Sequence, residues 1–100
     1  MDLDEMTTKL NERQAWVAGK RVKLDFGGQG SVMLDGVEQK VQRDGAGDAD
    51  TTIKVDWADW KQMANGQLDG MTAFMSGKLK IEGDMSNAMQ LQSVLGRLQG

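Results

Sequence analysis

The sequence predicts an α+β fold, a five-stranded, mostly antiparallel β-sheet with helices packed on one face. Apolar residues recur at helical spacing at both ends of the chain and in its middle, whereas five short segments alternate or are rich in β-branched residues. The order helix, hairpins, helix pair, strand, helix places the helices on one side of the sheet and leaves the other side polar. One hundred residues, 39% apolar and 27% charged, fit one domain, which we expect to span residues 1–100.

An amphipathic helix is predicted at the start of the chain, over residues 2–19. Asp2 or Asp4 is available as its N-cap, and Gly19 is placed to end it. Its apolar positions at helical spacing are Leu3, Met6, Leu10 and Val17. This spacing gives the helix one face to bury.

Three short strands are expected next, at residues 21–26, 31–35 and 37–42. The first alternates apolar and charged residues, as a strand with one wet face does. Asp35-Gly36, between the second and the third, is a dipeptide typical of hairpin turns. We therefore expect a three-stranded antiparallel meander.

A polar, glycine-rich turn at residues 43–50 separates this meander from a fourth strand at 51–55, which has a high β-branched content. Asp56 can cap the helix that follows, and Gly66 is placed to end it. Asp69 can cap a second, shorter helix.

The last quarter of the chain predicts a fifth strand at residues 78–82 and a final helix. The strand alternates, with Leu79 and Ile81 inward. The helix begins at Asp84 or Ser86, and its apolar positions are Met85, Ala88, Met89, Leu91, Leu95 and Leu98.

Composition and charge exclude several function classes. The chain has no Cys and no His, which removes disulfides, thiol nucleophiles, imidazole-based triads and ordinary zinc sites. Its net charge is −3, and its 12 Lys and Arg are scattered, so nucleic acid is not expected as a partner. The acidic N-terminus is unlike a signal peptide, and no apolar run is long enough to cross a membrane, so we expect a cytoplasmic protein.

The glycine-rich and acidic turns do not form a recognisable cofactor or metal motif. Gly28-Gln29-Gly30 and Gly45-Ala46-Gly47 both lack the third glycine of a dinucleotide-binding loop. Asp44, Asp48 and Asp50 crowd one turn, but an EF-hand counted from Asp48 puts Ile53 where glycine is needed. We expect solvated turns here, with no cofactor and no metal.

Catalysis is not expected either. The aspartates fall at predicted turns and caps, where solvent makes them poor acid–base catalysts. Lys78 and Lys80 flank Leu79 on the wet face of the fifth strand, so neither is placed as a desolvated catalytic amine.

Methionine is the most unusual component, with 8 residues in 100, five of them between residues 63 and 89. An unbranched thioether adapts to irregular apolar shapes and suits a site for flexible chains. Met and aromatic side chains at helical spacing also fill ordinary cores. The pattern alone leaves core packing and a ligand pocket both open, and the same holds for Trp57 and Trp60.

Residues 74–84, Phe-Met-Ser-Gly-Lys-Leu-Lys-Ile-Glu-Gly-Asp, resemble the signature of the sterol carrier protein 2 (SCP2) lipid-binding family. The run Ala-Met-Gln-Leu-Gln-Ser-Val-Leu at 88–95 follows in register, and residues 49–55 and 66–69 are similar to the family's fourth strand and to the connection before its short helix. The resemblance covers nearly the whole chain.

This resemblance implies a five-stranded sheet with helices over one face and an apolar tunnel between the two layers. The implied ligands are fatty acyl chains, acyl-CoA, phospholipid or sterol, and the implied activity is binding or transfer without catalysis. Transient membrane contact fits this role, and the oligomeric state is not determined by the sequence. The side chains that we expect to contact the ligand are Trp16, Val32, Leu34, Trp60, Met63, Met71, Phe74, Met75, Met85, Met89 and Leu95. The alternative is a protein-interaction or dimerisation module that uses the same apolar groove.

Overall fold

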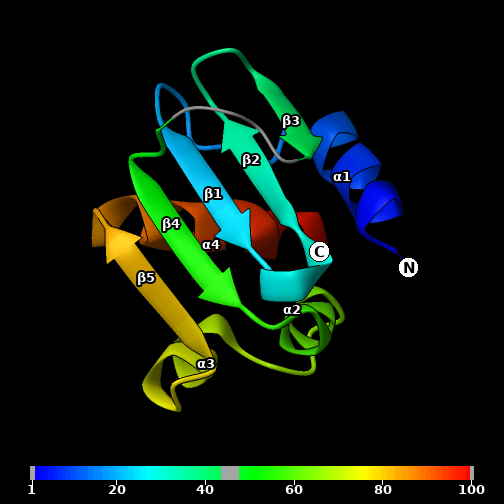
Figure 1. Ribbon diagram of the computed structural model, residues 1–100, viewed down its shortest axis with the longest axis vertical. Coiled ribbons are helices and arrows are strands. Elements are labelled where there is room, and N and C mark those ends of the chain that lie inside the picture. The colour runs from blue at the N-terminus through cyan, green and yellow to red at the C-terminus, as the bar shows by residue number, and fades with distance from the viewer. Residues whose placement is uncertain (1, 44–47, 100) are drawn as a thin grey trace.

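The computed structural model describes residues 2–43 and 48–99, apart from the side chains of 64 and 95–99 (Figure 1). The elements in chain order are α1 (Leu3–Glu12), β1 (Arg21–Asp25), the 3-10 turn η1 (Gly27–Gln29), β2 (Ser31–Asp35), β3 (Lys40–Arg43), β4 (Thr51–Val55), α2 (Trp57–Ala64), α3 (Gly70–Met75), β5 (Leu79–Gly83) and α4 (Met85–Gln99). The predicted glycine turn at 45–47 and Asp44 lie outside the described residues. No helix in the described part of the chain is both long and apolar enough to span a membrane.

The five strands form one sheet in the order β3-β2-β1-β4-β5 (Figure 1). The pairs β1–β2, β2–β3 and β4–β5 are antiparallel, which confirms the predicted meander and the predicted fold class. The central pair, β1–β4, is parallel. The chain therefore crosses from the β3 edge back to the middle of the sheet before it enters β4.

One face of the sheet forms the core with all four helices. Strand alternation puts Val22, Leu24 and Ile53 on this face, where Leu24 lies between Val32 and Ile53 in register. Figure 1 shows α2 and α4 behind the sheet and α1 beside β3. The core also receives side chains from every helix: Leu3, Met6, Leu10, Trp60, Ala73, Ala88 and Leu91.

The opposite face is mostly polar, as predicted. In register across it lie Lys23, Thr52 and Glu82, and Lys54 forms a 2.9 Å ion pair with Glu82. One apolar residue breaks the pattern, because Met33 is buried on this face although its register partners are Lys23 and Gln42.

The first helix is shorter than its apolar spacing predicts. It ends at Glu12, and Gln14 adopts a φ of 56°, which the helix cannot continue through. Val17 is nonetheless buried, because the loop after the helix folds back onto the core. The prediction that Val17 belongs to the helix was wrong, since burial in a loop happened to match helical spacing.

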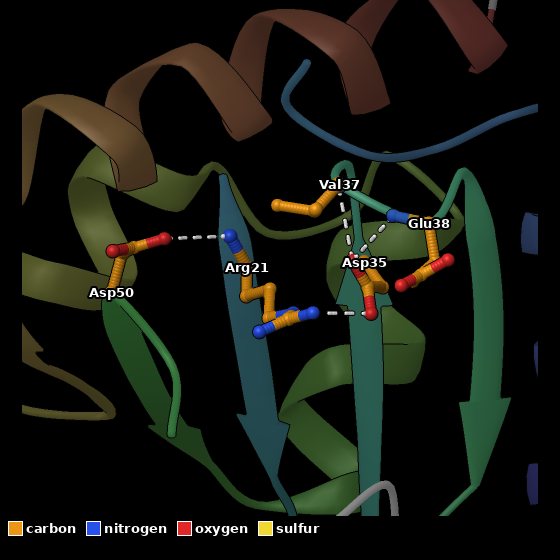
Figure 2. Close-up of polar contacts among 5 residues, drawn as sticks. All are labelled: Arg21, Asp35, Val37, Glu38 and Asp50. Atoms are coloured by element: carbon orange, nitrogen blue, oxygen red, sulfur yellow. Dashed lines mark hydrogen bonds and ion pairs between the residues drawn. The ribbon is translucent and has the colours of Figure 1, made fainter. Parts of the chain in front are cut away.

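The third strand starts at Lys40 and not at residue 37 (Figure 2). Oδ1 of Asp35 accepts hydrogen bonds of 2.9 Å from the backbone amides of Val37 and Glu38, which holds these residues in a turn. Val37 is 52% exposed as a result. The strand prediction was wrong here because the Asp35 side chain accepts hydrogen bonds from the two backbone amides that strand pairing would otherwise have used.

Asp35 is also held by β1. Nε of Arg21 lies 3.2 Å from Oδ2 of Asp35, and the Arg21 amide donates to Oδ2 of Asp50 at 2.9 Å (Figure 2). Burial raises the pKa of Asp35, but the amides of Glu38 and Val37 and the Arg21 guanidinium outweigh it and leave the pKa below its ordinary value. This carboxylate fixes the turn end of the sheet.

Candidate functional site

An apolar cavity of about 120 Å³ lies between the β4–β5 half of the sheet and the helices α2, α3 and α4. Apart from Gln92, its lining side chains are apolar. The lining residues are Ile53, Trp60, Met63, Gly70, Met71, Phe74, Leu79, Ile81, Met85, Ala88, Met89, Leu91 and Gln92. Such a surface can hold hydrocarbon by contact alone.

The floor of the cavity comes from two strands at one edge of the sheet. Ile53 of β4 faces Ile81 of β5 in antiparallel register, and Leu79 lies opposite Val55. Because side chains alternate along a strand, these residues all point toward the helices. Leu79 and Ile81 were expected to point inward, and the structure confirms this orientation.

The short helix α3 is held by its N-cap and buries few side chains against the rest of the protein. The Asp69 side chain accepts from the Thr72 amide at 3.2 Å, which confirms the predicted N-cap. Ala73 is the one buried residue of the helix. Gly66 before it and Gly77 after it have φ of 77° and 80°, conformations that glycine adopts without steric cost.

The helix α4, in contrast, is fixed at its N-terminal end. The Asp84 carboxylate accepts from the hydroxyl and the amide of Ser86 at 2.7 Å and 2.9 Å, and these two hydrogen bonds lower the pKa of Asp84. Asn87 donates to the buried hydroxyl of Thr51 on β4. Ala88 and Leu91 are buried over the cavity floor.

The cavity is closed toward the core and open toward α3 and α4. Trp60 and Leu91 are almost fully buried. By contrast, four lining side chains are exposed by between 38% (Phe74) and 60% (Met89), the other two being Met71 and Met85. Residues that line a cavity and also meet solvent form its mouth.

An aromatic cluster supports the closed end. The indole N–H of Trp60 donates to the sulfur of Met6, which links α2 to α1. The Phe26 ring packs edge-on against Trp57 and Trp60, with centroids 5.3 Å and 5.6 Å apart. Trp60 thus serves both the core and the cavity, the two roles that the sequence left open.

Six of the eleven candidate ligand residues line the cavity: Trp60, Met63, Met71, Phe74, Met85 and Met89. Val32 and Leu34 are fully buried on β2, two strands away from β4, and do not line it. Trp16 packs against the core, and Met75 projects from α3 with 79% of its surface exposed. The side chain of Leu95 lies outside the described part.

Sequence reasoning missed Ile53, Gly70 and Gln92 as lining residues, and placed Ala88 and Leu91 only on the apolar face of the last helix. The sequence did contain a pattern that indicates the lining residues of the last helix, because Met85, Ala88, Met89 and Gln92 follow the i, i+3, i+4, i+7 spacing of one helix face. For Ile53 there was none, since spacing does not say which strand lies beneath which helix.

Charged groups with perturbed pKa values lie elsewhere. Besides Asp35 and Asp84, the pKa of Lys54 is raised by its hydrogen bond to Glu82. None of these groups lines the cavity, and each shift follows from a bond that holds the fold together. Among the described residues no group of three or more acidic side chains could hold a metal ion.

The chain is similar to known proteins in sequence and in fold. Residues 3–96 match the model of the SCP-2 sterol transfer family. The crystal structure of sterol carrier protein 2 like 2 from Aedes aegypti superposes with a TM-score of 0.78, at 19% identity, over 92% of this chain and 94% of that one. The palmitated form of the same protein superposes with a TM-score of 0.73, at 20% identity and 95% coverage of each chain.

Two curated relatives share sequence with the chain. The oleate-induced peroxisomal protein POX18 of Candida maltosa is 31% identical over 94 residues, 93% of this chain and 63% of the relative. Hydroxysteroid dehydrogenase-like protein 2 of Xenopus tropicalis is 44% identical over 50 residues, which are half of this chain and 12% of that protein. The chain therefore spans a small part of the second relative and less than two thirds of the first.

Proposed function

The chain belongs to the SCP-2 sterol transfer family, a lipid-binding family, and from this premise we propose that its apolar cavity binds the hydrocarbon chain of a lipid. The ligand classes that fit are fatty acyl chains, acyl-CoA, phospholipid or sterol. The observation that carries the proposal is the position of the cavity, which lies between the β-layer and the later helices and has an almost wholly apolar lining.

Four methionines, Met63, Met71, Met85 and Met89, make this lining soft. Their side chains change rotamer readily and keep contact with a flexible chain. Each buried methylene contributes roughly 0.8 kcal/mol, so a long acyl chain needs no charged clamp. Polar groups at the mouth would only orient a headgroup. Tolerance of several lipids follows.

Known relatives favour an acyl chain as the ligand. The Aedes aegypti protein has been determined in a palmitated form, and the Candida maltosa relative is described as oleate-induced. Both names refer to unbranched long-chain fatty acids. We propose the same ligand class here.

The cavity widens to take a complete chain. Its volume of about 120 Å³ is below the roughly 150 Å³ of an engineered cavity that binds benzene. Since α4 is fixed to β4 and α3 has one buried residue between two glycines, α3 is the wall that moves outward. The proposed tunnel is the channel that this movement opens.

We propose that the protein acts without catalysis. The described groups with shifted pKa values, Asp35, Lys54 and Asp84, lie outside the cavity lining and have structural partners. No acid, base or nucleophile among the described residues faces the bound chain, so binding and release, with transient membrane contact, are the whole proposed activity.

The cellular location stays a prediction. The sequence favours the cytoplasm, whereas the Candida maltosa relative is named as a peroxisomal protein. Microscopy of the tagged protein in its own cells distinguishes the two compartments.

A second candidate function is a protein-interaction or dimerisation module. The observation in its favour is the exposure of Met75 and Met89 beside the cavity mouth. It predicts a mass that rises with protein concentration and does not respond to lipid, which analytical ultracentrifugation with and without palmitate would show.

The test of lipid binding uses two substitutions on the same helix. Ala88→Phe fills the cavity, whereas Gln90→Phe adds the same side chain at an exposed position outside the lining. We expect A88F to weaken displacement of a fluorescent fatty acid by about tenfold or more, through lost burial of methylenes, and Q90F to bind normally.

Native mass spectrometry of the gently purified protein gives a second readout. Wild type and Q90F should retain lipid that A88F lacks. If A88F is poorly folded by thermal unfolding, the smaller Ala88→Leu replaces it. Equal binding by folded A88F and Q90F, or failure of the wild type to bind any of a broad lipid panel, contradicts the proposal.

A further inference from the structure

The mouth of the cavity is surrounded by exposed apolar side chains. Met71 and Phe74 of α3 and Met85 and Met89 of α4 both line the cavity and meet solvent. Met75, on α3 but outside the lining, is the most exposed large apolar residue described, at 79%. These five residues, which we call the rim, form an apolar surface that continues into an apolar interior. Surfaces of this kind are typical of interaction sites.

Charge is distributed unevenly around the rim. The chain has 15 Asp and Glu, yet none falls within residues 70–81 or 85–99, the segments that carry the rim. The first of these segments carries Lys78 and Lys80, of which Lys80 lies opposite Lys54 on the polar face of the sheet, away from the cavity. Lys78 lies three residues after the end of α3 and is exposed. Within residues 70–78, which carry the α3 part of the rim, Lys78 is the one charged residue, and the carboxylates just before the two rim helices, Asp69 and Asp84, accept hydrogen bonds from the first turns of α3 and α4.

We propose that the rim is the surface by which this protein docks on a lipid bilayer, mouth first, with Met75 inserted at the level of the headgroups and Lys78 beside anionic ones. Exposed apolar side chains next to a cation suit a membrane interface. This inference rests on the proposed lipid-binding function and adds the partner surface and the orientation.

The anchoring of the two helices fits this orientation. The fixed helix α4 keeps its place against β4 through Asn87 and Thr51. The thinly anchored α3 carries Met71, Phe74 and Met75 and lies between Gly66 and Gly77. Insertion of α3 side chains into the bilayer therefore pulls on the weaker wall of the cavity. Docking and opening become one movement, which lets a chain pass without crossing water.

The test is co-sedimentation with sucrose-loaded vesicles, either pure phosphatidylcholine or phosphatidylcholine with one-fifth phosphatidylglycerol. Met75→Glu places a charge on the rim without changing a lining residue. The matched control is Val37→Glu, an apolar residue 52% exposed in the β2–β3 turn. Figure 1 shows this turn at the opposite end of the sheet from α3. Both substitutions occur at exposed positions, so both variants are expected to fold.

We expect M75E to lower the vesicle partition coefficient about tenfold on both kinds of vesicle, and V37E to leave it unchanged. Lys78→Glu should weaken binding to the vesicles with phosphatidylglycerol more than to phosphatidylcholine alone, because the local attraction becomes repulsion. Binding of a fluorescent fatty acid without vesicles should be the same in M75E, V37E and wild type.

Several results overturn the docking surface. One is equal loss of vesicle binding in M75E and V37E, and another is a wild type that binds soluble fatty acid but no vesicles. If the wild type instead forms a dimer and binds no vesicles, and M75E is a monomer, the rim is the contact surface for a second copy of the chain. Vesicle binding that M75E abolishes, in a protein that binds no soluble lipid, supports the docking surface and contradicts the proposed function alone.

Discussion

The side-chain amide of Asn87 donates a 3.2 Å hydrogen bond to the hydroxyl of Thr51, and both residues are almost fully buried. The Thr51 hydroxyl in turn donates a 2.6 Å hydrogen bond to the backbone carbonyl oxygen of Asp84. Two residues 36 positions apart thereby fix the start of α4 on the central part of the sheet. This contact holds the α4 wall of the cavity against the sheet.

Thr51→Val should destabilise the protein by roughly 1–3 kcal/mol, because it leaves the buried amide of Asn87 without its acceptor. The matched control is Thr52→Val, on the polar face of the same strand. Urea unfolding followed by tryptophan fluorescence measures both variants. Equal midpoints for T51V and T52V would show that the contact does not stabilise α4.

Asp35→Asn tests the carboxylate at the β2–β3 turn. The pKa of Asp35 is lowered by folding, so the ionised group stabilises the native state above its ordinary pKa, and this stabilisation is lost as pH falls through the folded value. We expect D35N to cost about 1–2 kcal/mol at neutral pH, with a difference from wild type that shrinks below about pH 4.

Urea unfolding between pH 7 and pH 2.5 follows this difference. Asp56→Asn serves as the control, since the Asp56 side chain makes no cap hydrogen bond, and its unfolding free energy at pH 7 should stay within about 0.5 kcal/mol of wild type. A D35N difference that stays constant down to pH 2.5 contradicts the assignment.

Gly36→Ala should be among the most damaging small substitutions. A Cβ at this position would lie 1.7 Å from the carbonyl oxygen of Val17 and 2.8 Å from that of Lys20, and both are backbone atoms. The Gly36 amide also donates to Lys20 at 2.8 Å. We expect a loss of about 3 kcal/mol or more, because the two backbones must separate.

Gly19→Ala separates this clash from backbone strain. Gly19 has a φ of 76° but open space where a Cβ would lie. The G19A substitution should therefore lower the free energy of unfolding by only about 1–2 kcal/mol. Thermal unfolding compares the two variants. If G36A were as stable as G19A, the Val17–Lys20 loop would have to move away from the added methyl group at little cost in free energy, which would contradict this prediction.

Most strands and the cap of α3 could be predicted from the sequence because their causes are local, whereas the Asp56 side chain, expected to cap α2, makes no cap hydrogen bond. The strands at 31–35 and 51–55 have the predicted bounds, and Asp69 caps α3 as expected. Val17 and Val37 could not be placed, since a loop can bury a valine and a turn can expose one. The strand order β3-β2-β1-β4-β5 is a tertiary property. It puts Ile53 under the helices and removes Val32 and Leu34 from the cavity, which spacing along the chain does not encode.

The most direct test of lipid binding in the cavity uses the methyl signals of the eight methionines. The protein is labelled with 13C at the methionine methyl groups and titrated with palmitate while methyl NMR spectra are recorded. Met63, Met71, Met85 and Met89 line the cavity, whereas Met33 is buried away from it.

We predict that palmitate shifts the four cavity methyl signals and leaves that of Met33, on the opposite face of the sheet, in place. In A88F the four signals should remain unshifted at the same palmitate concentration. Shifts confined to methionines outside the cavity, or no shift at saturating palmitate, would contradict the claim that this cavity holds a lipid chain.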